Sequence, residues 1–550
     1  MNLIYDPWIP IRRRDGRQHQ IAPWQLTEQY DTNPIVDILS PRGDFGGALM
    51  EFLIGLLQTT STIEREEDWE DAFEDPPSSD ELRTQLDPVA PAFEFDGPGP
   101  RFMQDFDLSE GETKEIASLL IDAPGDNSLR NNLDHFIKRD YVQGMCAACA
   151  ATALFTLQTN APAGGAGHRT SLRGGGPLTT LVICDPRQTD DAVSPTLWRN
   201  LWLNVLETPE FLNPSGNPSK TELADVFPWL APTRASDKTG RNTTADDVSP
   251  SQMFWGMPRR IRLDFEALQA GRCDICGTRS ESLVTQYITK NYGINYVGPW
   301  LHPLTPHSFD KQKMPLPRHP QPGGMSYRHW LGLVHTIDAD EQKPARVVDA
   351  FNKRRLGMQL RLWAFGYDMD NMKARCWYES QIPLYQLEET IRHEFAATVA
   401  QLVQAADTAR TYLFVAVKDA WFDKGALQRK TDISFIGQAF WQDTEREFYG
   451  CLGELAEKLA PLENRDERLI LRTRVKQAWH GTLCRQAQRL FDQWANSEAI
   501  AYANPRRIAT AHNQLHKNLY GSKLCTTILE LPKKAKAKGV AGDATAVSAG

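Results

Sequence analysis

Residues 146–184 read CAACAATALFTLQTNAPAGGAGHRTSLRGGGPLTTLVIC, a Cys-x-x-Cys pair followed by an apolar run, two glycine clusters and a β-prone end. The stretch predicts a helix joined to a strand by a glycine-rich connection. Backbone without side chains can approach a ligand closely, and the guanidinium groups of Arg169 and Arg173 suit phosphates. The segment therefore indicates either a nucleic-acid contact or a plain connection between two elements.

A second Cys-x-x-Cys pair, Cys273 and Cys276, lies in GRCDICGT. Cys-x-x-Cys followed by glycine is typical of a zinc knuckle, in which a tight turn presents two sulfurs on one tetrahedral edge. In a reducing compartment such pairs are more often metal ligands than disulfides. We predict one structural zinc site ligated by all four cysteines, Cys146, Cys149, Cys273 and Cys276. Two unrelated pairs, or reduced thiols in the core, remain the alternative.

Length, charge and hydropathy limit the class of protein. The chain has 550 residues, a net charge of −9 and 41% hydrophobic residues, as expected for a multidomain globular protein. The most apolar run, ALMEFLIGLL, is too short to span a membrane and contains Glu51. The N-terminus has no secretory signal, so we expect a cytoplasmic protein without membrane contact. The acidic charge argues against coating DNA by bulk electrostatics, so any nucleic-acid contact must be local.

The pattern of apolar residues changes near residue 380. Before it, helical and strand-like segments alternate irregularly, which predicts one large mixed α/β domain over residues 1–380. After it, apolar residues recur every three or four positions in four segments, which predicts an antiparallel four-helix bundle over residues 381–530. The last helix is expected to begin at Asn504 and Pro505. Residues 531–550 predict a disordered basic tail. The fold class is therefore α+β.

Two further groups of residues could bind a ligand. His302 and His307 could ligate a metal, although such histidines are more often core or loop residues. FGYDMDNMKARCW, residues 365–377, reads as a loop in which Asp368, Asp370 and Asn371 suggest a divalent cation, but it lacks the glycine and glutamate of an EF-hand. Met369 and Met372 could instead wedge between bases, or the segment could be a buried turn. Walker A, HExxH and GxSxG signatures are missing, which lowers the odds of an enzyme.

Several blocks in a fixed order resemble the CasA family, the large subunit of the type I-E CRISPR surveillance complex Cascade. The resemblance runs from residue 1 to about 529 and includes the four C-terminal helices. The blocks are NLIYDPWIPI, CAACAATALF, NAPAGGAG with SLRGGGPLTT, RCDICG, GPWLHPLTP and KRRLGMQLRLWAFGYDMDN.

The resemblance implies a non-catalytic protein of antiviral defence beside the 5′ end of the CRISPR RNA. Such a subunit tests duplex DNA for the protospacer-adjacent motif (PAM) from the minor groove, whose pattern is degenerate. It then starts strand separation and R-loop formation, and recruits the helicase-nuclease. RNA pairing, not the protein, reads the remaining sequence. The implied partners are duplex target DNA, the CRISPR RNA, and the backbone, small and 5′-handle-binding subunits.

The resemblance also assigns site residues. The glycine loop falls on Ala163–Gly167, with two alanines where some relatives are expected to have glycine. The family's lysine finger falls on Asn291, with Lys290 beside it, and either could face the PAM. Its glutamine wedge falls on Asn371. The implied DNA contacts are Gly164, Gly165, Ala166, Gly167, Arg169, Lys290, Asn291, Met369, Asp370 and Asn371. The implied contacts to the RNA handle are Asn131 and Phe136.

Two other classes of protein remain as alternatives. A zinc-dependent nuclease or hydrolase would use His302, His307 and Asp368 or Asp370, and would need an open metal position with a bound water. A scaffold protein would bind only other proteins through its helical bundle.

Overall fold

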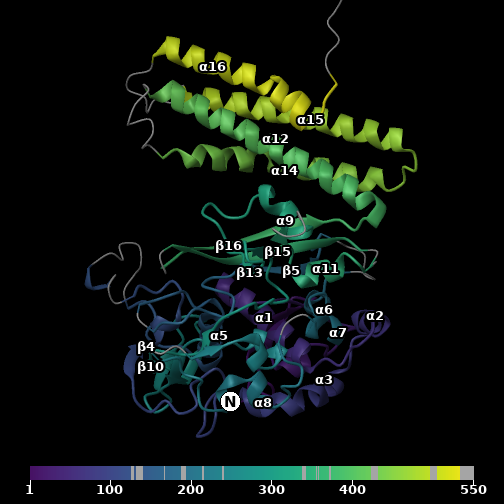
Figure 1. Ribbon diagram of the computed structural model, residues 1–550. Helices are drawn as coiled ribbons and strands as arrows, with labels where there is room; N and C mark the ends of the chain where they lie inside the picture. The colour runs from purple at the N-terminus through teal and green to yellow at the C-terminus, as the bar shows by residue number, and fades with distance from the viewer. Residues whose placement is uncertain are drawn as a thin grey trace, which may run out of the picture. The chain divides into compact units, whose positions relative to one another are not determined.

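The computed structural model describes residues 1–532 except 126–128, 132–139, 166, 188–193, 214–215, 238–240, 337–341, 355, 357, 371–372, 423–431 and 496–503. The chain forms two compact units (Figure 1). The first comprises Met1–Met325 and His329–Gln386, and the second begins at Leu387 and also includes Ser326–Arg328. The first mixes helices and strands and the second is helical, so the predicted α+β fold class is confirmed.

The first unit contains several small sheets and a set of mostly short helices. Its sheets have the strand orders β2-β1-β3, β4-β10-β7, β16-β15-β5 and β13-β12-β14, with the pairs β11-β6 and β8-β9. The strands are β1 (Ile9–Arg13), β2 (Gln18–Ile21), β3 (Ile35–Ile38), β4 (Glu112–Glu115), β5 (Thr179–Cys184), β6 (Asn242–Thr243), β7 (Arg260–Leu263), β8 (Gln269–Arg272), β9 (Arg279–Leu283), β10 (Gln286–Lys290), β11 (Asn295–Tyr296), β12 (His307–Phe309), β13 (Pro315–Pro317), β14 (Gln342–Lys343), β15 (Leu360–Asp370) and β16 (Lys373–Leu384). The helices are α1 (Gly43–Thr60), α2 (Glu66–Glu74), α3 (Ser79–Leu86), α5 (Ala147–Asn160), α6 (Leu197–Trp202), α7 (Thr208–Leu212), α8 (Leu223–Val226), α9 (Trp330–Val334) and α11 (Arg346–Phe351).

Helix α1 lies at the centre of the aromatic core of this unit. Its Phe52 makes edge-to-face contacts with five aromatic rings at centroid distances of 5.2–5.9 Å. Such contacts add to the free energy of burying the rings. The five rings belong to Trp8, Phe93, Phe102, Phe155 and Trp255. The apolar run around Glu51 is thus a buried helix, and none of the helices among the described residues is long and apolar enough to cross a membrane.

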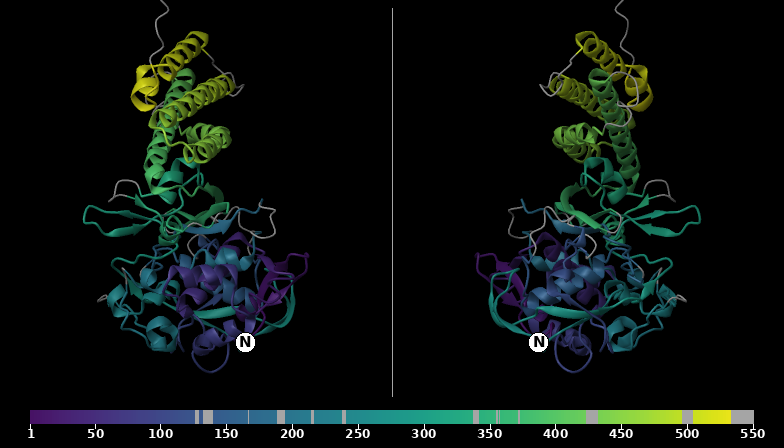
Figure 2. Two further views of the ribbon diagram at one scale, coloured as in Figure 1. Left: turned by 90° about the vertical axis from the view of Figure 1, so that its right-hand side faces the viewer. Right: turned by 90° about the vertical axis from the view of Figure 1, so that its left-hand side faces the viewer.

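The second unit contains α12 (Glu389–Trp421), α14 (Ser434–Leu459), α15 (Arg465–Ala495), α16 (Pro505–Leu519) and a π-helical turn over Lys523–Ile528. Helix α12 packs against the other three long helices, which run side by side in Figures 1 and 2. The predicted start of the last helix is confirmed, because the Asn504 side chain accepts a hydrogen bond from the Arg507 backbone at 3.1 Å. From residue 533 on, the predicted basic tail lies outside the described residues.

Tyr327 completes the core of the helical unit. Its ring stacks on Phe448 at a centroid distance of 4.2 Å, and its hydroxyl lies 2.8 Å from the Thr444 hydroxyl. Burial raises the pKa of this phenol, so the hydroxyl stays neutral. A polar group buried with a partner costs little, which explains how a tyrosine fits among apolar helices.

Candidate metal centre and nucleic-acid interface

The fold brings both cysteine pairs to one place. Cys146 is the N-cap of α5 and Cys149 lies in its first turn, whereas Cys273 and Cys276 lie in the tight turn between β8 and β9. The four sulfurs all lie within 4.8 Å of one another, and those of Cys146 and Cys276 are 3.7 Å apart. The predicted clustering of the four cysteines is confirmed.

Backbone contacts hold the two cysteine segments together. The carboxylate of Asp274 accepts hydrogen bonds from the backbone of Gln143 at 2.7 Å and of Gly144 at 2.9 Å. Met145 and Val284 form an antiparallel bridge. Gly277 adopts φ +75°, a left-handed conformation that closes the turn after Cys276. These backbone contacts hold the two cysteine segments side by side.

The four sulfurs fit a tetrahedral ion. Zinc bound at about 2.3 Å from each sulfur would place neighbouring sulfurs about 3.8 Å apart, close to the observed distance between Cys146 and Cys276. Hydrogen bonds from Cys146 and Cys149 hold the pKa of the Cys273 thiol well below its ordinary value. Hydrogen bonding to Cys146 and Cys273, together with burial, raises the pKa of Cys149. Zinc binds thiolates, so a bound divalent cation would compensate the negative charge of the deprotonated sulfurs.

The residues of the predicted hydrolase site are not arranged for catalysis. His302 and His307 are buried, and burial lowers the pKa of both rings, to about 4 for His307. His302 Nδ1 accepts a hydrogen bond from the Leu304 backbone at 3.2 Å. Among the described residues, the four cysteines form the sole cluster of three or more metal-ligating side chains. The histidines therefore act as core residues.

The segment read as an acidic loop is mostly an antiparallel hairpin. Residues 365–370 lie in β15 and 373–377 in β16, so the expected loop is wrong for these residues. Asp368 is buried and accepts two hydrogen bonds from Arg375 at 2.7 and 3.0 Å, and Asp370 lies 3.5 Å from the same guanidinium. Because an arginine already neutralises these carboxylates, they do not form a cation site. Asn371 and Met372 lie outside the described residues.

The glycine loop lies against the segment that follows β10. Gly167 adopts φ +81°, and its carbonyl accepts a hydrogen bond from the Tyr292 backbone at 2.8 Å. A Cβ at this position would lie 2.9 Å from Asn291 Cβ. Glycine is therefore required at position 167 by both conformation and space. The predicted glycine loop and the predicted lysine-finger segment are neighbours, although more than a hundred residues separate them in the sequence.

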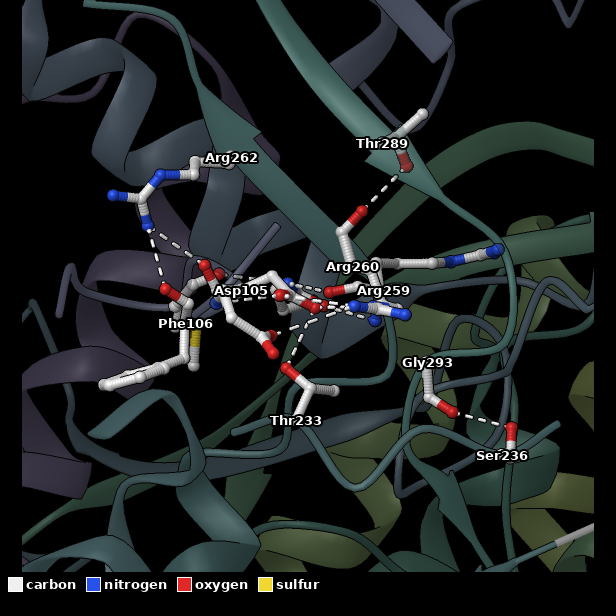
Figure 3. A network of polar contacts seen from close by, with 12 residues as sticks. Asp105, Phe106, Thr233, Ser236, Arg259, Arg260, Arg262, Thr289 and Gly293 are labelled. Atoms are coloured by element: carbon white, nitrogen blue, oxygen red, sulfur yellow. Dashed lines mark hydrogen bonds and ion pairs between the residues drawn. The ribbon is translucent and has the colours of Figure 1, made fainter. Parts of the chain in front are cut away.

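A serine links the same two segments a second time. Arg169 Nε donates to Ser236 Oγ at 2.7 Å, and this hydroxyl donates to the Gly293 carbonyl at 2.7 Å, a contact visible in Figure 3. The Arg169 guanidinium also lies 5.9 Å from the centre of the Tyr292 ring. Sequence reasoning missed Ser236 and Tyr292, since neither lies in a motif.

Lys290 and Asn291 present their side chains to solvent at the end of β10. Both are exposed, and Lys290 forms no ion pair with the described carboxylates. Tyr292 follows with φ +66°, an uncommon conformation for a residue with a bulky side chain. This left-handed turn points the chain back toward Gly167 and leaves two polar side chains beside the glycine loop.

The second glycine cluster contacts the hairpin. Gly176 adopts φ +63°, and a Cβ there would lie 2.8 Å from Met369 Cγ and 2.9 Å from the Tyr367 carbonyl oxygen. Directly after this cluster, β5 pairs with β15 in antiparallel register. Met369 is half-buried and Asp370 is exposed. The hairpin is thus connected to the glycine-rich segment by contact as well as by strand pairing.

Arg173 is not available to a phosphate, contrary to the expectation from its place between the glycines. It is 3% exposed and forms an ion pair with Glu51 of α1, which is 5% exposed. Its Nη1 donates to the hydroxyls of Thr179 at 3.1 Å and Thr305 at 3.0 Å. Arg173 therefore anchors the glycine segment to the core.

The remaining predicted residues are only partly described. Gly164 is half-buried, Gly165 is exposed and Ala166 lies outside the described residues. Asn131 is an exposed turn residue, and Phe136 lies outside the described residues. The structure thus brings together the glycine loop, Arg169, Lys290 and Asn291, and connects Met369 to them through the second glycine cluster.

Most of the chain matches one class of protein from CRISPR systems. The family described as CRISPR-associated protein Cse1 matches residues 2–490, and the chain belongs to this family. The resemblance inferred from the ordered blocks is confirmed.

Solved structures of the same class share this fold. CasA from Thermus thermophilus is 17% identical with a TM-score of 0.64, covering 94% of this chain and 99% of that one. Thermobifida fusca Cse1 is 18% identical with a TM-score of 0.64, covering 94% and 98%. A chain of a structure described as a CRISPR RNA-guided surveillance complex is 15% identical with a TM-score of 0.65, covering 95% and 99%.

Proposed function

We propose that this protein is the non-catalytic large subunit of a type I-E CRISPR RNA-guided surveillance complex, working in the cytoplasm. It recognises the PAM in duplex DNA from the minor groove, promotes strand separation and R-loop formation, and recruits a helicase-nuclease. One observation carries the proposal: the Tyr292–Gly167 hydrogen bond joins the glycine loop to the segment that bears Lys290 and Asn291.

The chemistry of these segments suits a minor groove. Gly165 is exposed, and a Cβ added there would meet no atom within 4 Å, so its backbone can approach a base edge without a side chain between them. Lys290 offers a cation and Asn291 an amide donor and acceptor beside the same loop. A local surface of this kind can contact DNA although the whole chain carries a charge of −9.

The hairpin of β15 and β16 suits strand separation. Two long paired strands make a stiff support, and the tip bears Met369 and Asp370 with Asn371 beyond them. Apolar and amide side chains near the end of a paired hairpin can enter a base step and unstack it. We propose that this tip is the wedge, with Asn371 and Met369 in contact with bases.

The proposed partners follow from the family and from the solved complex. They are the CRISPR RNA, duplex target DNA, the backbone, small and 5′-handle-binding subunits, and the helicase-nuclease. Asn131 and Phe136 are the proposed contacts to the RNA handle. In this proposal residues 1–380 recognise DNA, whereas the helical bundle of residues 381–530 contacts partner subunits.

The four cysteines are proposed to hold one structural zinc ion. When bound, zinc would cross-link the start of α5 to the turn between β8 and β9 and supply folding free energy. Because four sulfurs complete a tetrahedron, they leave no open position for a water or substrate. Cys146 and Cys149 also fix the N-terminal end of the helix that leads into the glycine loop.

The test uses the chain assembled with its partner subunits and a CRISPR RNA. Binding to target duplex with and without a PAM is measured for wild type, Gly165→Ala and Gly99→Ala. Gly99 is an exposed glycine whose added Cβ also meets no atom within 4 Å, so it is the matched control. We expect Gly165→Ala alone to weaken PAM-dependent binding. Wild-type binding that ignores the PAM would refute the proposed function.

Two further comparisons assign the individual residues. Lys290→Ala and Asn291→Ala, measured on duplexes with altered PAM bases, should differ in the bases that they discriminate. Replacing Asn371 and Met369 together by alanine should impair R-loop formation on intact duplex but leave binding to pre-melted target unchanged. Equal loss on both substrates would contradict the wedge.

A further inference from the structure

Arg259 is a half-buried cation without an acidic partner among the described residues. It begins the sequence RRIR at the start of β7, where the other two arginines have clear partners. Arg260 Nε donates to Asp105 Oδ2 at 2.6 Å, and Arg262 Nη1 donates to the Asp105 carbonyl at 3.1 Å. Figure 3 shows the Arg259 side chain leaving the strand away from this carboxylate. Arg259 forms no ion pair with any carboxylate in the part of the chain that the structure describes.

Backbone contacts place Arg259 against the DNA-facing segments. Its N–H donates to Gln158 Oε1 at 2.9 Å, and Gln158 Nε2 donates back to the Arg259 carbonyl at 3.0 Å. Its Nη2 donates to the carbonyl of Pro162, the residue directly before the glycine loop. On the other side, a Cβ on Gly293 would lie 2.0 Å from the Pro258 carbonyl oxygen. The guanidinium therefore lies against the residue before the glycine loop, and the backbone that bears it lies against Gly293.

The hydrogen bonds of this guanidinium are incomplete. Its Nε and Nη1 atoms are buried and have no hydrogen-bond partner among the described residues. Buried polar groups almost always find partners, and an exception calls for an explanation. Burial lowers the pKa of Arg259 to about 10, which still leaves the side chain charged at neutral pH. The protein therefore keeps an uncompensated positive charge beside the glycine loop.

Arg173 shows that the fold can neutralise a buried arginine in the same segment. Glu51 and two threonine hydroxyls satisfy its guanidinium. Nothing comparable surrounds Arg259 among the described residues, and the exposed cation of Lys290 adds a second positive charge nearby. A negative group from another molecule would complete this arrangement. The backbone phosphates of duplex DNA are that group if the glycine loop enters a groove.

We propose that Arg259 is an electrostatic positioning residue that draws a DNA backbone phosphate toward the glycine loop. Its charge acts from beside the loop while its Nη2 holds the carbonyl of Pro162, the residue directly before Ala163, as DNA approaches. The inference rests on the proposed function, because it needs duplex DNA at the glycine loop.

The test compares Arg259→Gln and Arg259→Lys in the assembled complex. Affinity for PAM-bearing duplex is measured at salt concentrations from about 50 to about 200 mM, because log K falls with log salt by about 0.9 per phosphate neutralised. We expect Arg259→Gln to bind about tenfold more weakly at low salt and with a slope smaller by about 0.9. Arg259→Lys keeps the positive charge, so the slope of log K against log salt concentration should equal that of the wild type.

Arg346→Gln is the matched control. Arg346 is also half-buried, its pKa is lowered by burial to about 10, and its Nη1 lacks a hydrogen-bond partner among the described residues. Its Nη2 donates to carbonyls of residues 210, 211 and 213, not to the glycine loop. This variant should leave both the DNA affinity and the salt slope unchanged.

Stability separates a charge effect from a structural one. Removing an unpaired buried charge should leave the unfolding midpoint unchanged or raise it, so Arg259→Gln is expected to fold while losing DNA affinity. If Arg259→Gln does not assemble with the partner subunits, the same salt-dependent binding is measured for Arg259→Met. If Arg259→Gln or Arg259→Met shows the same dependence of log K on log salt as the wild type, the inference about Arg259 is overturned but the proposed function is not. Wild-type complex that fails to bind PAM duplex overturns the proposed function instead.

Discussion

The buried pair of Arg173 and Glu51 gives the sharpest test of how the glycine segment is held. Replacing Arg173 by methionine keeps the length of the side chain but leaves the Glu51 carboxylate buried without its cation. Two threonine hydroxyls also lose a donor, at 3.1 Å for Thr179 and 3.0 Å for Thr305. The substitution therefore removes an ion pair and two hydrogen bonds at one buried point.

The magnitude follows from burial. Both side chains are almost fully buried, at 3% and 5% exposure. Breaking one partner of such a pair costs about 3–5 kcal/mol, because an uncompensated charge stays in the core. Removing both charges by Glu51→Met with Arg173→Met should be far less harmful, since an apolar pair of similar volume is often neutral. We therefore expect a coupling free energy of about 3 kcal/mol.

The assay is a double-mutant cycle. Urea unfolding of the wild type, both single variants and the double variant is followed by tryptophan fluorescence and by circular dichroism. The urea concentration at the midpoint of unfolding of the first unit should fall strongly in each single variant. It should return close to the wild-type value in the double variant. A double variant that loses as much stability as the sum of the single variants would refute the pairing. PAM-dependent binding should fall in Arg173→Met, because the glycine segment loses its anchor.

Three other outcomes are expected. Each single Cys→Ser substitution in the four-cysteine cluster should reduce bound zinc in metal analysis, and zinc retained by all four variants would contradict the shared site. Gly167→Ala should lose about 1–2 kcal/mol from its left-handed backbone alone and impair PAM binding, whereas Gly165→Ala should unfold like the wild type. The pKa of His307 is lowered from 6.5 to about 4, so the folded state resists a proton that the unfolded chain accepts. The contribution of the neutral His307 ring to the free energy of unfolding is fully present above pH 6.5. It decreases by about 3 kcal/mol as the pH falls toward 4. His307→Asn should show a smaller loss over the same pH range in urea titrations, and an unchanged loss would contradict the buried neutral ring.

Local patterns in the sequence were sufficient to predict the C-terminal helices but not the hairpin of β15 and β16. The stripe of the helix at Leu402 and the cap at Asn504 depend on residues a few positions apart, so periodicity and capping identified them. The hairpin of β15 and β16 was read as a loop around Asp368 and Asp370. Methionine and acidic residues in this segment hide the alternation of apolar and polar residues that is typical of a strand. The Asp368 carboxylate is tolerated there because Arg375 on the paired strand neutralises it.

The sequence by itself determined which residues could do chemistry: two thiol pairs, a glycine loop, a few cations and a helical C-terminal region. Tertiary structure decided which of them are available. Arg173 and Arg259 look alike in sequence, yet one finds its carboxylate on a distant helix and the other finds none among the described residues. Partners and burial depend on long-range packing, which no short window of sequence contains. The same packing placed Gly167 against Tyr292 and thereby turned separate motifs into one surface.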